Sequence, residues 1–359
     1  MKRFRWTAPL AAAACAVGLV AGAGSAGAAS NDPLRPELWG LDQVRAEKAW
    51  SSTTGEGATV AVVDTGVDLG HPDLEGQLVP GATFVCEEGH KGSCGDGSWK
   101  GIDGKGQESD VHGTHVAGTI AATADNGVGV AGVAPDAKIM PIKVLEDGSG
   151  TNDDIAEGIR WAADHDADVV NLSLGGLPGT QIFSILGLDT TTKDAIQYAR
   201  GKGTLTVAAA GNTSTLLCND PAFTSDSICV GATDRKEMKS YFSELPVTFR
   251  GKGVAAPGGS GRLFGGPCSE DIISTVPRGT GSGECHGKDY EALAGTSMAT
   301  PHVAGVAALL YGQGRSMGNV EQSILETARN PLWGVRGGFS AFYGRGIVDA
   351  QAATAHARG

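Results

Sequence analysis

The chain has 359 residues, of which 41% are hydrophobic and 19% charged, and its formal net charge at pH 7 is −12. This length can bury a large core, and such an acidic protein is not expected to bind nucleic acid or an anionic membrane. No Pro/Ser-rich linker or internal repeat divides the sequence, so we expect a single domain with insertions, present as a monomer.

The first 28 residues have the pattern of a secretory signal peptide. Three basic residues precede an apolar run over residues 10–20, and Ala26-Gly27-Ala28 fits a cleavage site. The run is too short to cross a bilayer, and no later stretch reaches the roughly eighteen apolar residues that a membrane helix needs. We therefore expect a secreted, extracellular protein with no membrane partner. Residues 29–47 then form an N-terminal arm, and residues 48–359 form the main domain.

Strand and helix patterns alternate along the main domain. Continuous apolar runs predict strands over residues 59–64, 138–145, 168–174, 204–210, 229–233, 253–256 and 272–275. Helical spacing predicts helices over residues 152–163, 190–200 and 319–327, and two further helices that begin at His112 and at Ser297. This alternation predicts an α/β fold of three layers, with a mostly parallel sheet covered by helices on both faces.

Three polar residues stand at the ends of these elements. Asp64 ends the first strand, His112 begins an early helix and Ser297 begins a late, almost wholly apolar helix. A serine hydroxyl becomes a nucleophile when an imidazole takes its proton, and a carboxylate on the other ring nitrogen orients the imidazole. The order Asp, His, Ser differs from that of the α/β-hydrolases and of the chymotrypsin-like enzymes. Taken alone, Asp64 is more often a turn former or cap, and Ser297 is more often a helix cap.

Acyl transfer also needs donors for an oxyanion. Asn212 follows a predicted apolar strand and Gly211, so its side-chain amide can supply one donor and the backbone amide of Ser297 the second. In isolation Asn212 is equally well explained as a turn residue.

The cysteines outside the leader fall into close pairs within glycine-rich stretches. An even number of cysteines in an exported chain indicates disulfides. We expect neighbouring cysteines to pair, with the pairs Cys86–Cys94, Cys218–Cys229 and Cys268–Cys285. A metal site formed by Cys86, His90 and Cys94 is the weaker alternative.

The sequence closely resembles the subtilisin-like serine peptidases of the secreted bacterial type. The resemblance covers most of the exported chain and includes VVDTGVDLGHPDL, HGTHVAGTIAA, TVAAAGN and GTSMATPHVAG. It implies a subtilisin-like fold and a serine endopeptidase with polypeptide substrates. By this resemblance Asp64, His112 and Ser297 form the catalytic triad and Asn212 is the oxyanion donor, while His71, His115 and His302 are structural.

The same resemblance implies a substrate site. Gly148, Ser149 and Gly150 match the family's edge strand, which pairs with an extended peptide through main-chain hydrogen bonds. A second strand, Ser173, Leu174, Gly175 and Gly176, pairs from the other side, and with residues 208–211, which include Ala210 and Gly211, it lines the main specificity pocket. These walls are small and uncharged, so we expect broad cleavage with a preference for apolar or aromatic side chains and none for basic ones.

Two further expectations concern folding and metal. Asp73 and Asn126 match liganding positions of a structural calcium site, although the ligand that the family often supplies from the arm falls near Arg35, which cannot bind a cation. No cofactor is expected for the chemistry. The segment between Ala28 and Asp64 is too short for the large propeptide domain of many family members. A narrow-specificity processing protease and an inactive binding protein of the same fold remain as alternatives.

Overall fold

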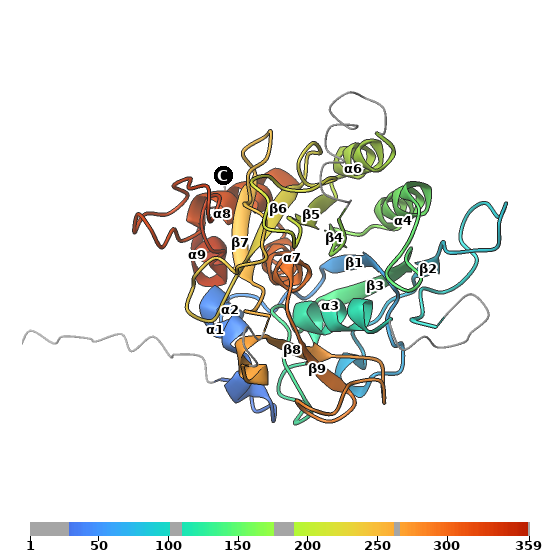
Figure 1. Ribbon diagram of the computed structural model, residues 1–359, viewed down its shortest axis with the longest axis horizontal. Helices are drawn as coiled ribbons and strands as arrows, with labels where there is room; N and C mark the ends of the chain where they lie inside the picture. The colour runs from blue at the N-terminus through green and yellow to red at the C-terminus, as the bar shows by residue number, and fades with distance from the viewer. Residues whose placement is uncertain (1–28, 101–109, 176–189, 262–265, 358–359) are drawn as a thin grey trace, which may run out of the picture.

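The computed structural model describes residues 29–100, 110–175, 190–261 and 266–357. Its centre is a parallel sheet with the strand order β2-β3-β1-β4-β5-β6-β7 (Figure 1). In chain order the strands are β1 (Thr59–Asp64), β2 (Ala82–Thr83), β3 (Lys138–Lys143), β4 (Val169–Leu172), β5 (Leu205–Ala209), β6 (Ile228–Thr233) and β7 (Gly253–Pro257). All but the two-residue β2 were predicted, with bounds that agree within one or two residues.

Both faces of the sheet are buried, which explains the continuous apolar runs. Along β1, Val60 and Val62 belong to one hydrophobic cluster, whereas Ala61 and Val63 belong to the other. Successive side chains of a strand point to opposite faces, so a strand covered on both sides is apolar at every position.

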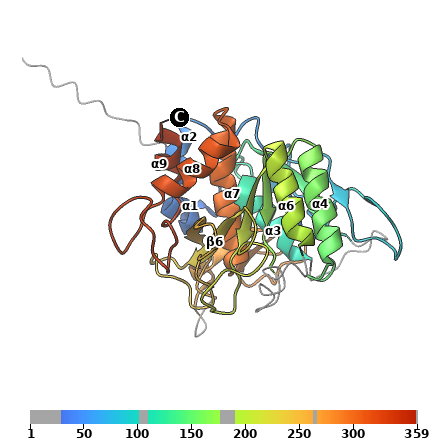
Figure 2. The ribbon, with the colours of Figure 1, turned by 90° about the horizontal axis from the view of Figure 1, so that it is seen from above.

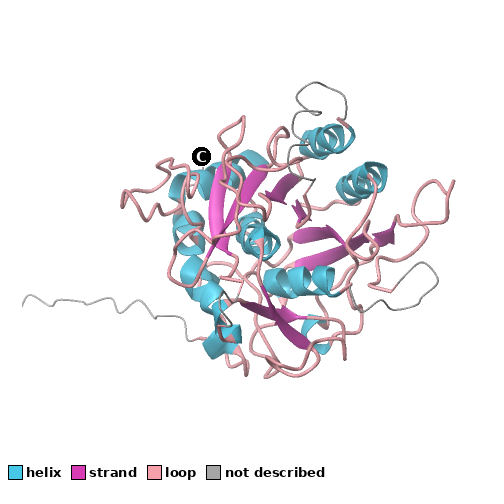
Figure 3. Ribbon diagram, viewed as in Figure 1, coloured by secondary structure: helices cyan, strands magenta, loops and turns pink. Residues whose placement is uncertain are grey.

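The helices form the two outer layers (Figure 3). Helices α4 (Asn152–Asp164) and α6 (Thr191–Lys202) lie side by side over one face, as Figure 2 shows. Helices α3 (Val111–Ala121) and α7 (Thr296–Gly312) pack against each other over the other face, and α8 (Met317–Thr327) and α9 (Ala350–Ala355) lie beside α7. Short 3₁₀ helices cover Arg35–Glu37 (η1), Pro72–Leu74 (η2) and Cys268–Glu270 (η3). The structure therefore confirms the predicted three-layer α/β fold.

The N-terminal arm belongs to the main core. It contains α1 (Trp39–Val44) and α2 (Ala46–Trp50), so the expected arm boundary at residue 47 falls within α2. Leu38, Trp39 and Val44 are buried in the same hydrophobic cluster as Val60 and Val62 of β1. The expected leader, residues 1–28, lies outside the described residues.

One predicted strand lies outside the parallel sheet. Residues Ile272–Thr275 form β8, which pairs antiparallel with β9 (Tyr290–Leu293) in a separate two-stranded sheet. This hairpin packs against α3 and ends just before α7. Within the described ranges, no helix is both long and apolar enough to cross a membrane.

Candidate active site

Asp64 ends β1 at the carboxyl edge of the sheet, where parallel α/β sheets hold their functional groups. Its side chain is buried, and the register of β1 and β3 places it beside Lys143. The backbone N–H of Thr65 donates to Asp64 Oδ1 at 2.8 Å. The second oxygen, Oδ2, is buried and accepts no hydrogen bond from the described part of the chain.

His112 is the second residue of α3 and contacts Asp64 directly. Its Nδ1 lies 2.7 Å from Asp64 Oδ1, and because a carboxylate can only accept, Nδ1 carries the hydrogen. Burial lowers the pKa of His112, but the negative charge of Asp64 and this hydrogen bond outweigh it, so the pKa lies above its ordinary value. The contact leaves Nε2 as the ring atom that can accept a proton.

Ser297 lies in the first turn of α7 and is partly exposed. Its hydroxyl donates to the carbonyl of Ser173 at 3.0 Å, and the hydroxyl of Ser173 donates to the carbonyl of Ser297 at 2.8 Å. The second bond has a simple cause, because Pro301 lies four residues after Ser297 in the helix and has no N–H for that carbonyl. This reciprocal pair joins the start of α7 to the end of β4. Among the described residues, the Ser297 hydroxyl makes no hydrogen bond to His112.

Asn212 follows β5 and is fixed by Thr296. Asn212 Oδ1 accepts from the backbone N–H of Thr296 at 2.8 Å and from its hydroxyl at 3.0 Å. A backbone N–H can only donate, so the amide oxygen must face Thr296 and the NH₂ group must point elsewhere. A Cβ on Gly295 would lie 3.5 Å from both Asn212 Nδ2 and the backbone nitrogen of Ser297. The two expected donors therefore border the same small space.

The expected pocket walls lie at the ends of β4 and β5. Leu174 and Gly175 follow β4, and Ala210 and Gly211 follow β5, next to β4 in the sheet. Gly176 lies outside the described residues. No charged side chain occurs among these wall positions.

Sequence reasoning missed a buried carboxylate behind this pocket. Glu244 is fully buried beside Gly211, and its backbone N–H donates to the Gly211 carbonyl at 3.1 Å. Its carboxylate accepts hydrogen bonds from Thr213 N–H, the Thr213 hydroxyl and the Thr215 hydroxyl. These donors hold the charge inside the protein, and the glutamate was missed because nothing in its local sequence marks burial.

The expected edge strand, residues 148–150, begins within a tight turn. Glu146 and Ser149 exchange two backbone hydrogen bonds of 2.8 and 2.9 Å, and the residues between them, Asp147 and Gly148, have φ of 49° and 71°. Positive φ at both central positions is characteristic of a type I′ turn. Residues 148–150 are exposed, so their backbone is accessible to an added strand.

The other histidines of the matching motifs have structural contacts. His115 Nε2 lies 2.9 Å from the Ile272 carbonyl, and burial lowers the pKa of His115 to about 3. His302 Nδ1 contacts the Met298 carbonyl at 2.8 Å, and burial lowers the pKa of His302 to about 4. His71 accepts from the N–H of Asp73, and burial lowers its pKa as well. All three rings are neutral near pH 7.

Two carboxylates meet at the expected calcium position. Asp73 accepts from the Asn126 side chain and from the Val130 N–H, each at 2.8 Å. Asp32, which sequence reasoning missed, accepts from the backbone N–H groups of Asp125 at 3.0 Å and Asn126 at 3.2 Å. Asp32 stands in the arm just before a proline, and this acidic residue ahead of the first helix was the available signal. Arg35 instead pairs with carboxylates of the arm itself.

The charge at this position suits a hard cation. Asp32 and Asp73 are both buried, and no ion pair neutralises either of them among the described residues. Burial, together with the negative charge of Asp32, raises the pKa of Asp73 to about 6. No group of three or more His, Cys, Asp or Glu side chains is arranged to hold a metal in the described ranges. Further oxygen ligands would therefore come from other groups, such as Asn126 or backbone carbonyls.

Each expected cysteine pair is at bonding distance. Cys86–Cys94, Cys218–Cys229 and Cys268–Cys285 have Cα–Cα distances of 6.0, 6.7 and 5.7 Å. The first bridge closes the loop after β2 and leaves no thiolate for a metal site with His90. The third bridge joins η3 to the β8–β9 loop.

Comparison with known proteins gives consistent matches. The chain matches the family model of the Subtilase family over residues 55–346. Thermitase from Thermoactinomyces vulgaris is 39% identical over 325 residues, which cover 90% of this chain and 98% of thermitase. Subtilisin BL from Lederbergia lenta is 38% identical over 319 residues, or 88% of this chain and 98% of the relative. A solved protease structure from Pseudoalteromonas arctica has a TM-score of 0.70 at 33% identity and covers 91% of this chain and 99% of that one.

Proposed function

Because this chain belongs to the subtilase family and is a serine-type endopeptidase, we propose that it cleaves polypeptides through an acyl-enzyme formed on Ser297. The observation that carries the proposal is the 2.7 Å hydrogen bond between His112 and Asp64 at the sheet edge that faces the start of α7. This bond fixes the imidazole tautomer, so that Nε2 can act as a general base.

In the proposed reaction, the Ser297 hydroxyl leaves the Ser173 carbonyl and transfers its proton to His112 Nε2. Ser297 Oγ then forms a bond to the carbonyl carbon of the substrate, and the π electrons of that carbonyl move to its oxygen. The C–N bond breaks as the imidazolium returns its proton to the leaving amine. Water, deprotonated by His112, next attacks the ester carbon. The ester C–O bond then breaks as the imidazolium returns its proton to Ser297 Oγ, which releases the second product. Asp64 stabilises the imidazolium in both halves.

The oxyanion of each tetrahedral intermediate is proposed to lie between Asn212 Nδ2 and the backbone N–H of Ser297. This assignment is supported by the position of both nitrogens around the space beside Gly295 and by the two bonds that Thr296 makes to Asn212 Oδ1. Donors that are fixed before the reaction need no reorganisation when the charge develops.

We propose broad cleavage with a preference for large apolar side chains before the scissile bond, because the described pocket walls carry no charge and Glu244 is buried behind them. The measurement is kcat/KM for a series of peptides that differ only at this position. Peptides with Phe or Leu are expected to be cleaved fastest. Fastest cleavage after Arg or Lys would contradict the proposal and would indicate that the substrate reaches Glu244.

We also propose export and a structural calcium ion. The leader pattern in residues 1–28 supports export. Asp32 and Asp73 would hold the calcium, and Asn126 Oδ1, which accepts from the Val128 N–H at 2.7 Å, would be a further oxygen ligand. Calcium takes no part in the hydrolysis, and its effect at this position would be to stabilise the fold.

The direct test of the active site is labelling by a fluorophosphonate, which reacts only with an activated serine. The wild type is expected to be labelled and to hydrolyse casein, whereas Ser297→Ala is expected to lose both properties while keeping the same circular dichroism spectrum. Ser51→Ala serves as a control, because it removes an exposed serine hydroxyl after α2 and leaves the nucleophile in place. A folded wild type without labelling would overturn the proposed function, as would a labelled Ser297→Ala.

A further inference from the structure

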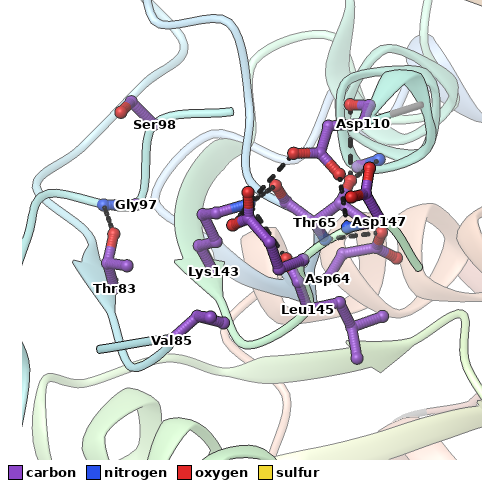
Figure 4. A network of polar contacts seen from close by, with 12 residues as sticks. Asp64, Thr65, Thr83, Val85, Gly97, Ser98, Asp110, Lys143, Leu145 and Asp147 are labelled. Carbon is purple, nitrogen blue, oxygen red and sulfur yellow. Dashed lines mark hydrogen bonds and ion pairs between the residues drawn. The ribbon is translucent and has the colours of Figure 1, made fainter. Parts of the chain in front are cut away.

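Lys143, the last residue of β3, is a fully buried cation beside the site (Figure 4). Its ammonium donates to the carbonyls of Thr65 and Leu145, each at 2.9 Å, and to Asp110 Oδ2 at 3.2 Å. It also forms an ion pair with Glu146 at 3.0 Å. The three hydrogens of the ammonium are thus used by three segments of the chain.

Each of these segments carries part of the proposed machinery. Thr65 follows Asp64 and binds its carboxylate through the backbone N–H. Asp110 is the N-cap residue of α3 and stands two residues before His112. Leu145 leads into the turn that presents residues 148–150 to the substrate.

Asp110 extends the connection. While its Oδ2 accepts from Lys143, its Oδ1 accepts from the backbone N–H of Asp147, at the centre of the turn, at 3.2 Å. Its side chain is as fully buried as that of Lys143. Lys143 and Asp110 together therefore connect the start of the His112 helix to the expected substrate edge.

Stability alone does not explain the buried ion pair of Lys143 and Asp110. Desolvation of two buried charges largely offsets their attraction, and apolar residues of similar volume are often equally stabilising or more so. A buried ammonium with fixed acceptors instead holds three segments in one geometry. In catalysis, a misplacement of about 1 Å can lower the rate about 100-fold.

We infer that Lys143 and Asp110 are positioning residues. They hold the turn after Asp64, the start of the His112 helix and the expected substrate edge at residues 148–150 in fixed positions relative to one another. This inference rests on the proposed function. It assigns Lys143 a twofold effect: the contacts to Thr65 and Asp110 maintain the triad geometry, and the contacts to Leu145 and the 146–149 turn maintain the binding of extended peptides.

The test compares Lys143→Met with wild type on two substrates, a short single-residue ester and a peptide that extends several residues before the scissile bond. Fluorophosphonate titration gives the concentration of active enzyme. We expect kcat to fall about 10- to 100-fold on both substrates and KM to rise only for the extended peptide. The double variant Lys143→Met/Asp110→Asn removes both charges, and it replaces the single variant if an unpaired Asp110 prevents folding.

Lys252→Met is the matched control. Lys252 pairs with Glu321 at 2.8 Å next to the start of β7, at the opposite end of the parallel sheet. The Lys252→Met variant is expected to have a lower melting temperature and an unchanged KM for both substrates. Equal changes of kcat/KM on both substrates, or kcat and KM within twofold of wild type, would overturn the inference for Lys143. An unlabelled wild type would instead overturn the proposed function.

Discussion

At the scale of single residues, the site depends on which side-chain atoms already form hydrogen bonds within the protein. Asn212 is oriented because its side-chain oxygen accepts both hydrogen bonds from Thr296, so its NH₂ group must point away from Thr296. His112 is oriented in the same way, because its Nδ1 hydrogen is committed to Asp64. In both side chains, one fixed atom determines the chemistry available to the other.

This reasoning gives a prediction for Asn212. Asn212→Ala removes one oxyanion donor but leaves Ser297, His112 and Asp64 in place. We expect fluorophosphonate labelling to persist and kcat on a peptide amide to fall roughly 100- to 1,000-fold, with a small change in KM. The measurement is steady-state kinetics normalised to titrated active sites. A kcat close to that of the wild type would show that Asn212 is not the donor.

Residues near the site differed in how well the sequence revealed them. Asp64 and His112 could be paired in advance because each ends or begins a strongly patterned element, and the structure joins them at 2.7 Å. Lys143 and Glu244 could not be predicted, and Asp32 was missed although it stands ahead of the first helix. Their roles depend on burial and on partners far along the chain, and the local sequence around a charged residue usually indicates exposure.

At the scale of elements, the strands of the main sheet were predictable because both of their faces are buried and their sequences are apolar throughout. The β8–β9 hairpin was predictable only in part. The strand pattern of residues 272–275 was visible, but its antiparallel partner Tyr290–Leu293 has mixed burial and lacks an apolar run. Which strands pair, and in which direction, is a property of the tertiary structure and not of a local pattern.

Elements also compensate for one another. Pro301 in the interior of α7 leaves the Ser297 carbonyl without a helical donor, and the Ser173 hydroxyl from the end of β4 supplies the missing hydrogen bond. The sequence did not reveal that the lost bond is replaced from another strand.

At the scale of the whole molecule, the expected calcium position joins segments that are far apart in the sequence. Asp32 comes from the arm, Asp73 from η2, and Tyr290, whose hydroxyl lies 3.3 Å from Asp73, comes from β9. Leu34 of the arm also donates to the carbonyl of Gly129 at 2.9 Å. Binding at this position should therefore stabilise the complete fold and not a single loop.

The stability of the metal-free protein is expected to depend on pH through Asp73. Its pKa is about 6 in the folded protein and about 3.9 in an unfolded chain, so the folded state holds the proton more tightly. A raised carboxyl pKa favours the folded state at low pH, and this contribution is lost as pH rises from about 4 to about 6. Above this range the buried carboxylate is charged, and a bound calcium ion would offset its cost.

Because Asp73 is charged above pH 6, calcium binding should stabilise the fold most at neutral pH. At pH 7.5 and fixed ionic strength, calcium at about 100 times its Kd should raise the melting temperature of the wild type by about 5 °C or more relative to chelator. The increase should be smaller at pH 5 and absent in Asp73→Asn. Asp42→Asn, which changes an exposed carboxylate of the arm, should keep the full response. Differential scanning calorimetry provides the measurement, and equal melting temperatures with calcium and with chelator at pH 7.5 would rule out the site.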